Sequence, residues 1–142
     1  MLYNQNDLKI LKDEIEFVDT AVIPFASSDM TVHAPLNSSN IEMLHLVSIQ
    51  LEKQFKGRLL ITPMMTTVDE NISVLASYVK QLRTYGFKNI VVLTHLKAEI
   101  DDAHRIKLNE IPLENMSNEM KIEMINDEVK TVMKSVISIW NK

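Results

Sequence analysis

Cysteine is absent from this chain of 142 residues, and glycine occurs only at Gly57 and Gly86. Without a thiol, the protein can form no disulfide, no thiolate nucleophile and no cysteine-bound zinc site. Loops that cradle phosphates use several glycines, because backbone N–H groups must approach the anion closely. Neither glycine lies in such a pattern, so the sequence excludes a dinucleotide-binding fingerprint and a P-loop.

Long apolar runs and excess positive charge are missing as well. No run approaches the roughly 20 apolar residues of a membrane span, so we predict none. The first residues, MLYNQNDLKILKDEIEF, carry early acids and no small-residue cleavage site, unlike a secretion signal. A formal charge of −4 provides no domain-wide basic field for phosphates, so nucleic acid is not an expected partner. We therefore expect a cytoplasmic protein.

The composition that remains is typical of a globular domain. Hydrophobic residues make up 46% of the chain and charged residues 24%. A chain of this length can bury a substantial core within one domain, and we find no linker, repeat or low-complexity segment. We therefore predict a single domain over residues 1–142.

Short apolar runs alternate with amphipathic segments along the first two-thirds of the chain. The runs at residues 20–25, 58–65 and 88–96 are typical of buried strands. Apolar residues at helical spacing predict helices over residues 7–18, 41–56 and 71–85. Strands and helices in this order predict right-handed crossovers and a parallel sheet. The predicted fold class is α/β: a three-layer, mainly parallel sheet of about four strands with helices on both faces.

The last third is less regular until its final helix. RIKLNEIPL alternates at Ile106 and Leu108 and is a candidate fourth strand, whereas KAEIDDAH reads as either a short helix or a loop. The structure of residues 97–115 stays open. Ser117 is the expected N-cap of a C-terminal helix that either packs on the sheet or makes a dimer contact. Its apolar face is predicted to contain Ile122, Ile125, Val129, Val132, Val136 and Ile139, widened by Met120, Met124, Met133 and Trp140.

Polar residues follow the predicted strands, where an open parallel sheet binds its ligands. The stretch FASSDMTVHAPLNSSN, residues 25–40, is longer than the about 2–6 residues of an ordinary strand-to-helix turn. It supplies Ser27, Ser28 and Asp29, and the next two strand ends supply Thr66 and Thr94. These five residues are the candidates for binding a small ligand, such as an anion held by hydroxyl groups and helix N-termini.

A metal site is a second hypothesis for the same edge. Asp29, His33 and His95 combine carboxylate and imidazole, which are the ligands that divalent metals use in proteins. Each also has a structural alternative: Asp29 can cap a turn, His33 can be a loop residue, and His95 can be half-buried and bonded to backbone. We interpret His45 as structural and His104, beside two aspartates, as part of a solvated loop.

The stretches EFVDTAVIPF, LEKQFKGRLLITP and GFKNIVVLT resemble the YpiF-like family of small uncharacterised bacterial proteins. The similarity runs over most of the chain. The family has no assigned activity, and its genes are found near those of a respiratory quinol–cytochrome complex, so this resemblance implies a setting and no chemistry.

A more distant resemblance concerns the metal-binding loop. VIPFASSDMTVHAPLNSSN is similar in layout to that loop of the creatininase-like amidohydrolases, and LRTYGFKNIVVLTHLKAE is similar to a later segment. The resemblance implies metal ligands at Asp29, His33 and His95. The family's first histidine is replaced near Thr31, its aspartate is lost near Asn40, and its later turn has glycines that are missing here. The ligand set is therefore depleted, and a divalent metal is a considered cofactor but not a favoured one.

The favoured interpretation is a non-catalytic α/β protein that contacts a protein partner or forms a homo-oligomer through the C-terminal helix. One alternative is a small-anion binder at the strand ends. The other is a divalent-metal-dependent amidohydrolase whose ligands are Asp29, His33 and His95, with metal-bound water as the nucleophile.

Overall fold

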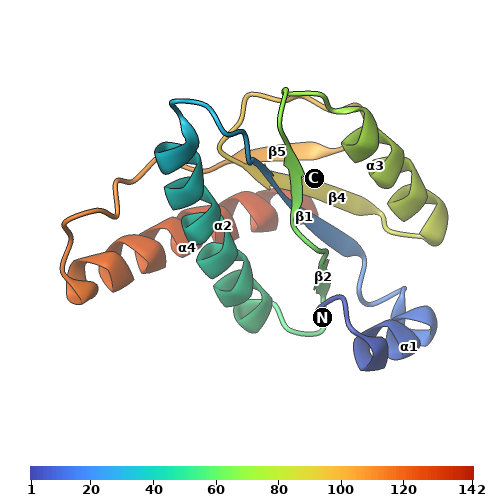
Figure 1. The fold of residues 1–142 in the computed structure, drawn as a ribbon. Coiled ribbons are helices and arrows are strands. Elements are labelled where there is room, and N and C mark those ends of the chain that lie inside the picture. Colours follow the sequence, from blue (N-terminus) through green and yellow to red (C-terminus); the bar gives the residue numbers. More distant parts are fainter.

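The computed structural model describes residues 1–142 and contains a five-stranded sheet whose strand pairings are all parallel (Figure 1). The central strand is β1 (Thr20–Ser27), which pairs on one side with β4 (Asn89–Thr94). On its other side, β1 pairs first with β2 (Leu59–Ile61) and then with β3 (Met65–Thr67). The outer strand next to β4 is β5 (His104–Lys107). The prediction of a mainly parallel sheet is confirmed.

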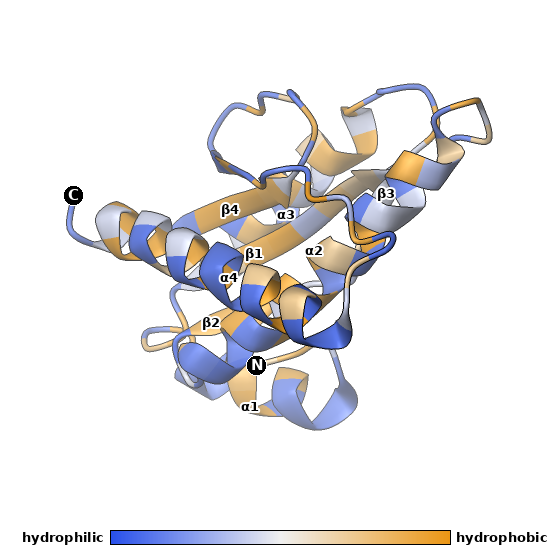
Figure 2. Cartoon of the chain, turned by 90° about the vertical axis from the view of Figure 1, so that its left-hand side faces the viewer, coloured by the Kyte–Doolittle hydropathy of each residue, from blue (hydrophilic) through white to orange (hydrophobic).

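Helices cover both faces of the sheet. The helices α2 (Ala34–Gln54) and α4 (Asn118–Trp140) pack on one face, and α1 (Gln5–Glu14) and α3 (Ser73–Tyr85) lie on the other (Figure 1). Figure 2 shows α4 in front of the sheet, with the apolar strands β1 and β4 behind it. Two hydrophobic clusters fill the two layers, with 16 and 12 buried residues. The predicted three-layer α/β architecture is therefore present.

The sequence of β1 explains why it is central. All eight of its residues are buried. Val22 and Ala26 point into the layer of α2 and α4, whereas Ile23 and Phe25 point into the layer of α1 and α3. A strand that is covered on both faces reads as a continuous apolar run rather than an alternating one.

The predicted second strand, over residues 58–65, is wrong as a single element. Pro63 separates β2 from β3 because proline has no N–H to give to a sheet ladder. The two short pieces pair with successive parts of β1, Thr20–Val22 and Phe25–Ser27. The sheet therefore has five strands instead of about four.

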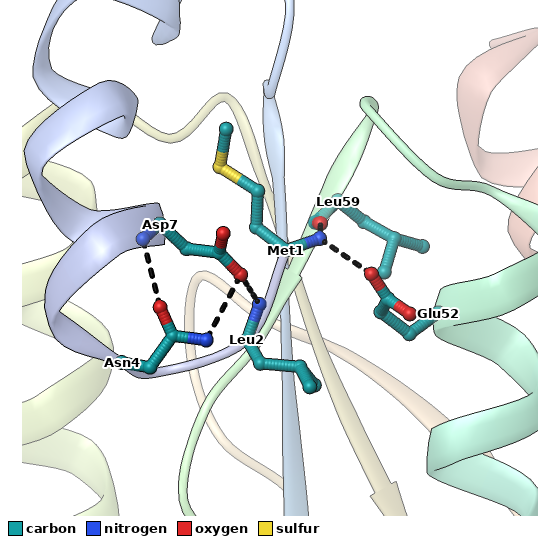
Figure 3. Close-up of polar contacts among 6 residues, drawn as sticks. All are labelled: Met1, Leu2, Asn4, Asp7, Glu52 and Leu59. Atoms are coloured by element: carbon teal, nitrogen blue, oxygen red, sulfur yellow. Dashed lines mark hydrogen bonds and ion pairs between the residues drawn. The ribbon is translucent and has the colours of Figure 1, made fainter.

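Two helix starts also differ from the prediction. The first turn of α2 begins at Ala34 rather than Ile41, because Pro35 is tolerated where helical N–H groups have no partner. The connection after β1 is thus only residues 28–33, an ordinary length. The start of α1 is set by Asn4, whose side chain accepts the Asp7 N–H at 2.7 Å (Figure 3).

The segment left open by the sequence contains no helix. Residues 97–103 are irregular, the candidate fourth strand is present as β5, and His104, expected in a solvated loop, is its exposed first residue. Residues 108–117 form a loop whose Leu113 is buried. Ser117 caps α4 as predicted, accepting the Met120 N–H at 3.2 Å. No helix combines the length and the apolar character that crossing a membrane requires.

The N-terminal residues cover one edge of the sheet (Figure 3). The amino group of Met1 donates to the Leu59 carbonyl at 2.7 Å and lies 3.2 Å from the carboxylate of Glu52 on α2. Leu2 continues the pairing with Ile61 of β2. The edge at β2 is therefore partly closed, whereas β5 has no strand on its outer side.

Candidate functional site

Asp29 is the centre of a hydrogen-bond network in the connection between β1 and α2. One carboxylate oxygen accepts from the Thr31 hydroxyl at 2.8 Å and from the Asn37 amide at 3.1 Å. The other accepts from the Ser27 hydroxyl at 3.3 Å. The hydrogen bond from Thr31 is the main reason that the pKa of Asp29 is lowered. Asp29 is thus an ionised residue that stabilises the turn, in agreement with the alternative that it is a turn cap.

The three predicted metal ligands do not gather at one point. His33 is the exposed N-cap residue of α2 and makes no capping bond with its side chain. His95 lies after β4 and is 7% exposed. No group of three or more His, Cys, Asp or Glu residues is placed to hold a metal ion. The arrangement of Asp29, His33 and His95 therefore provides no three-ligand centre.

Some of the hydroxyl groups predicted to bind a small ligand already make hydrogen bonds within the fold. Thr94 is completely buried, and its hydroxyl oxygen accepts the Leu96 N–H at 3.0 Å. Thr66 is exposed on β3, and the Ser28 N–H donates to the Thr67 carbonyl at 2.9 Å. The hydroxyl groups of Ser27 and Thr94 are therefore already engaged within the fold.

A cleft does exist beyond the carboxyl ends of the strands, with a volume of about 260 Å³. It lies on the α3 side, and its charged lining residues are Glu70 and Lys97. None of the five residues predicted to bind a ligand lines it. Its walls are Phe25, Glu70, Ile72, Leu96, Lys97 and Ala98.

His95 is the most unusual polar residue of the sheet. Both of its ring nitrogens are buried without a hydrogen-bond partner. Burial lowers the pKa of His95, and the carboxylates of Glu110 and Glu128 oppose that shift in part. The imidazole is therefore neutral near pH 7. His95 is therefore buried rather than half-buried, and the backbone contact that the sequence led us to expect is only a weak one with Asn109.

Glu128 is a buried acid that the sequence reading missed. It is 4% exposed on α4, and its carboxylate accepts the backbone N–H of Asn109 at 3.0 Å and the Asn109 amide at 3.3 Å. These bonds attach α4 to the loop after β5. The signal in the sequence was an acid directly before Val129, in the middle of the apolar face.

The C-terminal helix has a well-packed end and an exposed one. The indole N–H of Trp140 donates to the Thr20 hydroxyl at 2.7 Å, and its ring packs edge-on against Phe55 with centroids 4.8 Å apart. The guanidinium of Arg58 lies 3.7 Å from the centroid of that ring. These contacts anchor the last turns of α4 to the body of the domain.

The opposite end of α4 leaves apolar side chains in solvent. The first turns of the helix extend beyond α2 (Figure 1). Val129, Val132 and Val136 of the predicted apolar face are buried, whereas Ile122 of the same predicted face is 60% exposed. Other exposed apolar residues on this helix are Met120, Met124 and Ile137.

Comparisons with known proteins agree with one of the two resemblances. The family described as "Protein of unknown function (DUF2487)" matches residues 9–140. "Uncharacterized protein YpiF" of Bacillus subtilis (strain 168) is 26% identical over 147 residues, covering 99% of each chain. No solved structure matches the chain. The YpiF-like resemblance is confirmed, whereas the creatininase-like one stays a prediction.

Proposed function

The chain belongs to the DUF2487 family of proteins of unknown function, and we propose that it acts through protein–protein contact by pairing with a second copy through α4. The observation that carries the proposal is the apolar surface that α4 leaves in solvent. Ile122 is 60% exposed and Ile137 is 41% exposed. Large apolar side chains grouped on one exposed element are typical of contact surfaces.

The two exposed isoleucines lie on the same side of the helix. Ile122 and Ile137 are separated by about four helical turns of 3.6 residues, so their side chains point in similar directions. The half-buried Met133 lies between them on that side, together with Asn126 and Lys130. An apolar stripe with two polar positions can pack against an identical helix in a twofold dimer.

The charges of α4 favour an antiparallel arrangement of the two helices. Its acidic residues lie in its first half, and no acid follows Glu128. Lys130, Lys134 and Lys142 occupy the second half and the chain end. An antiparallel pair sets the acidic half of one copy beside the basic half of the other, whereas a parallel pair opposes like charges. The helix dipoles favour the same arrangement.

The test is sedimentation velocity over a wide concentration range. We expect the wild type to form a dimer, and Ile122→Glu to be monomeric because it buries a charge in the contact. The matched control is Met120→Glu, which changes an exposed residue on the opposite side of the same helix and should leave the dimer intact. Thermal unfolding by circular dichroism verifies that both variants fold. A wild type that stays monomeric at every concentration contradicts the proposal.

A second exposed surface lies at the carboxyl edge of the sheet and favours a different contact. Met30 is 92% exposed and Val32 is 87% exposed, both in the connection before α2. The neighbouring loop after β3 carries Val68, which is 68% exposed. The same assay applied to Met30→Ser with Val32→Ser distinguishes the two surfaces. If this variant is monomeric and Ile122→Glu remains dimeric, the contact belongs to the loops and not to α4.

The two alternatives from the sequence have less support. An anion at Ser27, Ser28, Asp29, Thr66 and Thr94 would meet the carboxylate of Asp29, which is ionised and occupies the centre of the loop network. A metal-dependent amidohydrolase needs ligands that converge, and no three candidate ligands do. Contact through α4 therefore remains the favoured proposal.

A further inference from the structure

A basic groove runs between β5 and the second half of α4. Its volume is about 480 Å³, and five of its nine lining residues can carry positive charge. No acidic residue lines it, although the whole chain has a formal charge of −4. The charged side chains that line this groove are therefore opposite in sign to the net charge of the protein. Its five basic residues are His104, Arg105, Lys107, Lys134 and Lys142.

The groove contains an open strand edge. β5 is the last strand of the sheet on this side. The Leu108 N–H donates to the Thr94 carbonyl of β4 at 2.8 Å. Backbone groups alternate in direction along a strand, so the N–H and C=O groups of Arg105 and Lys107 point away from β4. An extended peptide can pair with such groups and add a strand to the sheet.

Basic side chains flank this edge on both faces. Ile106 is buried in the layer of α2 and α4, so His104 lies on that same face by strand alternation, beside Lys134 of α4. Arg105 and Lys107 lie on the opposite face, and all three of these β5 residues are exposed. An added strand would therefore meet positive charge whichever way its side chains alternate.

From this geometry we infer that the groove binds an extended acidic segment of a partner protein, added as a strand along β5. Acidic side chains complement the groove, and the backbone of the segment pairs with Arg105 and Lys107. A second copy of β5 is a poor occupant because its charges repel. A nucleic acid fits less well, since its phosphodiester backbone cannot pair with a strand and no aromatic ring lines the groove for base stacking.

This inference is independent of the pairing through Ile122, because it concerns a different edge and a different partner. The test is fluorescence anisotropy with a labelled peptide of alternating Glu and Val, added to the full chain. Three further probes are the same peptide N-methylated at alternate backbone nitrogens, a peptide of alternating Lys and Val, and a single-stranded oligonucleotide. We expect only the unmodified Glu–Val peptide to bind well.

Variants of the groove residues test whether the peptide binds in the groove. Lys107→Glu is expected to weaken binding by about tenfold or more, since it introduces a like charge at the edge. Lys80→Glu reverses an exposed lysine on α3 and is the matched control, with no effect expected. Lys142→Glu, two residues after α4, repeats the test if Lys107→Glu does not fold. Amide chemical shifts of Arg105 and Lys107 should change on titration.

Three results would overturn the inference. Equal binding of the N-methylated peptide would mean charge attraction without strand pairing. Tighter binding of the oligonucleotide would assign the groove to nucleic acid. Absence of Glu–Val binding, or binding that Lys107→Glu and Lys142→Glu leave unchanged, would mean that the groove is not the site. The oligomeric state, measured separately by sedimentation, decides the α4 proposal and is not affected by these outcomes.

Discussion

Replacing His95 by leucine should stabilise the protein, although the residue is buried in the core. Both ring nitrogens are buried without a partner. A buried polar group that makes no hydrogen bond costs about 1–3 kcal/mol, and an apolar side chain of similar size avoids that cost. We therefore expect His95→Leu to raise the free energy of unfolding at neutral pH by an amount in that range.

The same substitution should remove a dependence of the protein's stability on pH. Burial lowers the pKa of His95 below the ordinary value of 6.5, so the unfolded chain takes up this proton first as the pH falls. Stability from the neutral imidazole is thus complete above about pH 6.5 and is lost as the pH falls below it. The loss is at most about 1.4 kcal/mol per pH unit for one proton. The loss of stability ends once the pH is low enough for His95 to bind the proton in the folded state as well.

The assay is urea unfolding of the wild type and the variant from neutral pH down to mildly acidic pH. The difference between the two free energies should be constant above neutrality and widen below it. His95→Gln keeps a buried polar group but cannot titrate, so it should lose the pH dependence without the gain at neutral pH. His45→Leu, at an exposed position, should not raise the free energy of unfolding at neutral pH. A His95→Leu variant that is destabilised at neutral pH would refute the reasoning.

Two further predictions concern single residues with a clear geometric role. Gly86 has φ +128°, and a Cβ there would lie 3.2 Å from Ile15, so Gly86→Ala should cost about 1–3 kcal/mol by thermal unfolding. Gly57 has φ +86° but open space around it, so Gly57→Ala should lower the free energy of unfolding less, by about 1 kcal/mol. Equal losses of stability in the two variants would contradict the contact between residue 86 and Ile15. Trp140→Phe should cost about 1 kcal/mol in urea unfolding through the lost hydrogen bond to Thr20. In a double-mutant cycle with Thr20→Val, purely additive effects would rule that bond out.

The strands and most helices could be predicted because their signals are local. β1 and β4 are apolar runs, and α3 ends at Tyr85 as predicted, directly before Gly86. The start of α2 was missed because its first turns are rich in residues typical of loops. Pro35 fits the first turn, and the Ser38 hydroxyl donates to the Pro35 carbonyl at 2.7 Å.

The candidate site was harder to predict, because residues at neighbouring strand ends can have side chains that point to different faces of the sheet. His95 has the same parity as Val91 and Leu93, and those two side chains lie in the layer of α2 and α4. Strand alternation alone would have placed His95 inside that layer rather than in an open site. The exposure of Ile122 could not be predicted from helical periodicity, since it depends on how far α4 extends beyond α2.

The most direct measurement of the proposed pairing uses the absence of cysteine in the chain. Single cysteines can be introduced on α4 and oxidised, and disulfide-linked dimers then form only where the two copies meet. In an antiparallel pair, Lys130 is close to the midpoint between Ile122 and Ile137 and therefore close to the twofold axis. We predict linked dimers from Lys130→Cys and none from Ile122→Cys. Linked dimers from both would indicate a parallel pair, and none from either would contradict contact through α4.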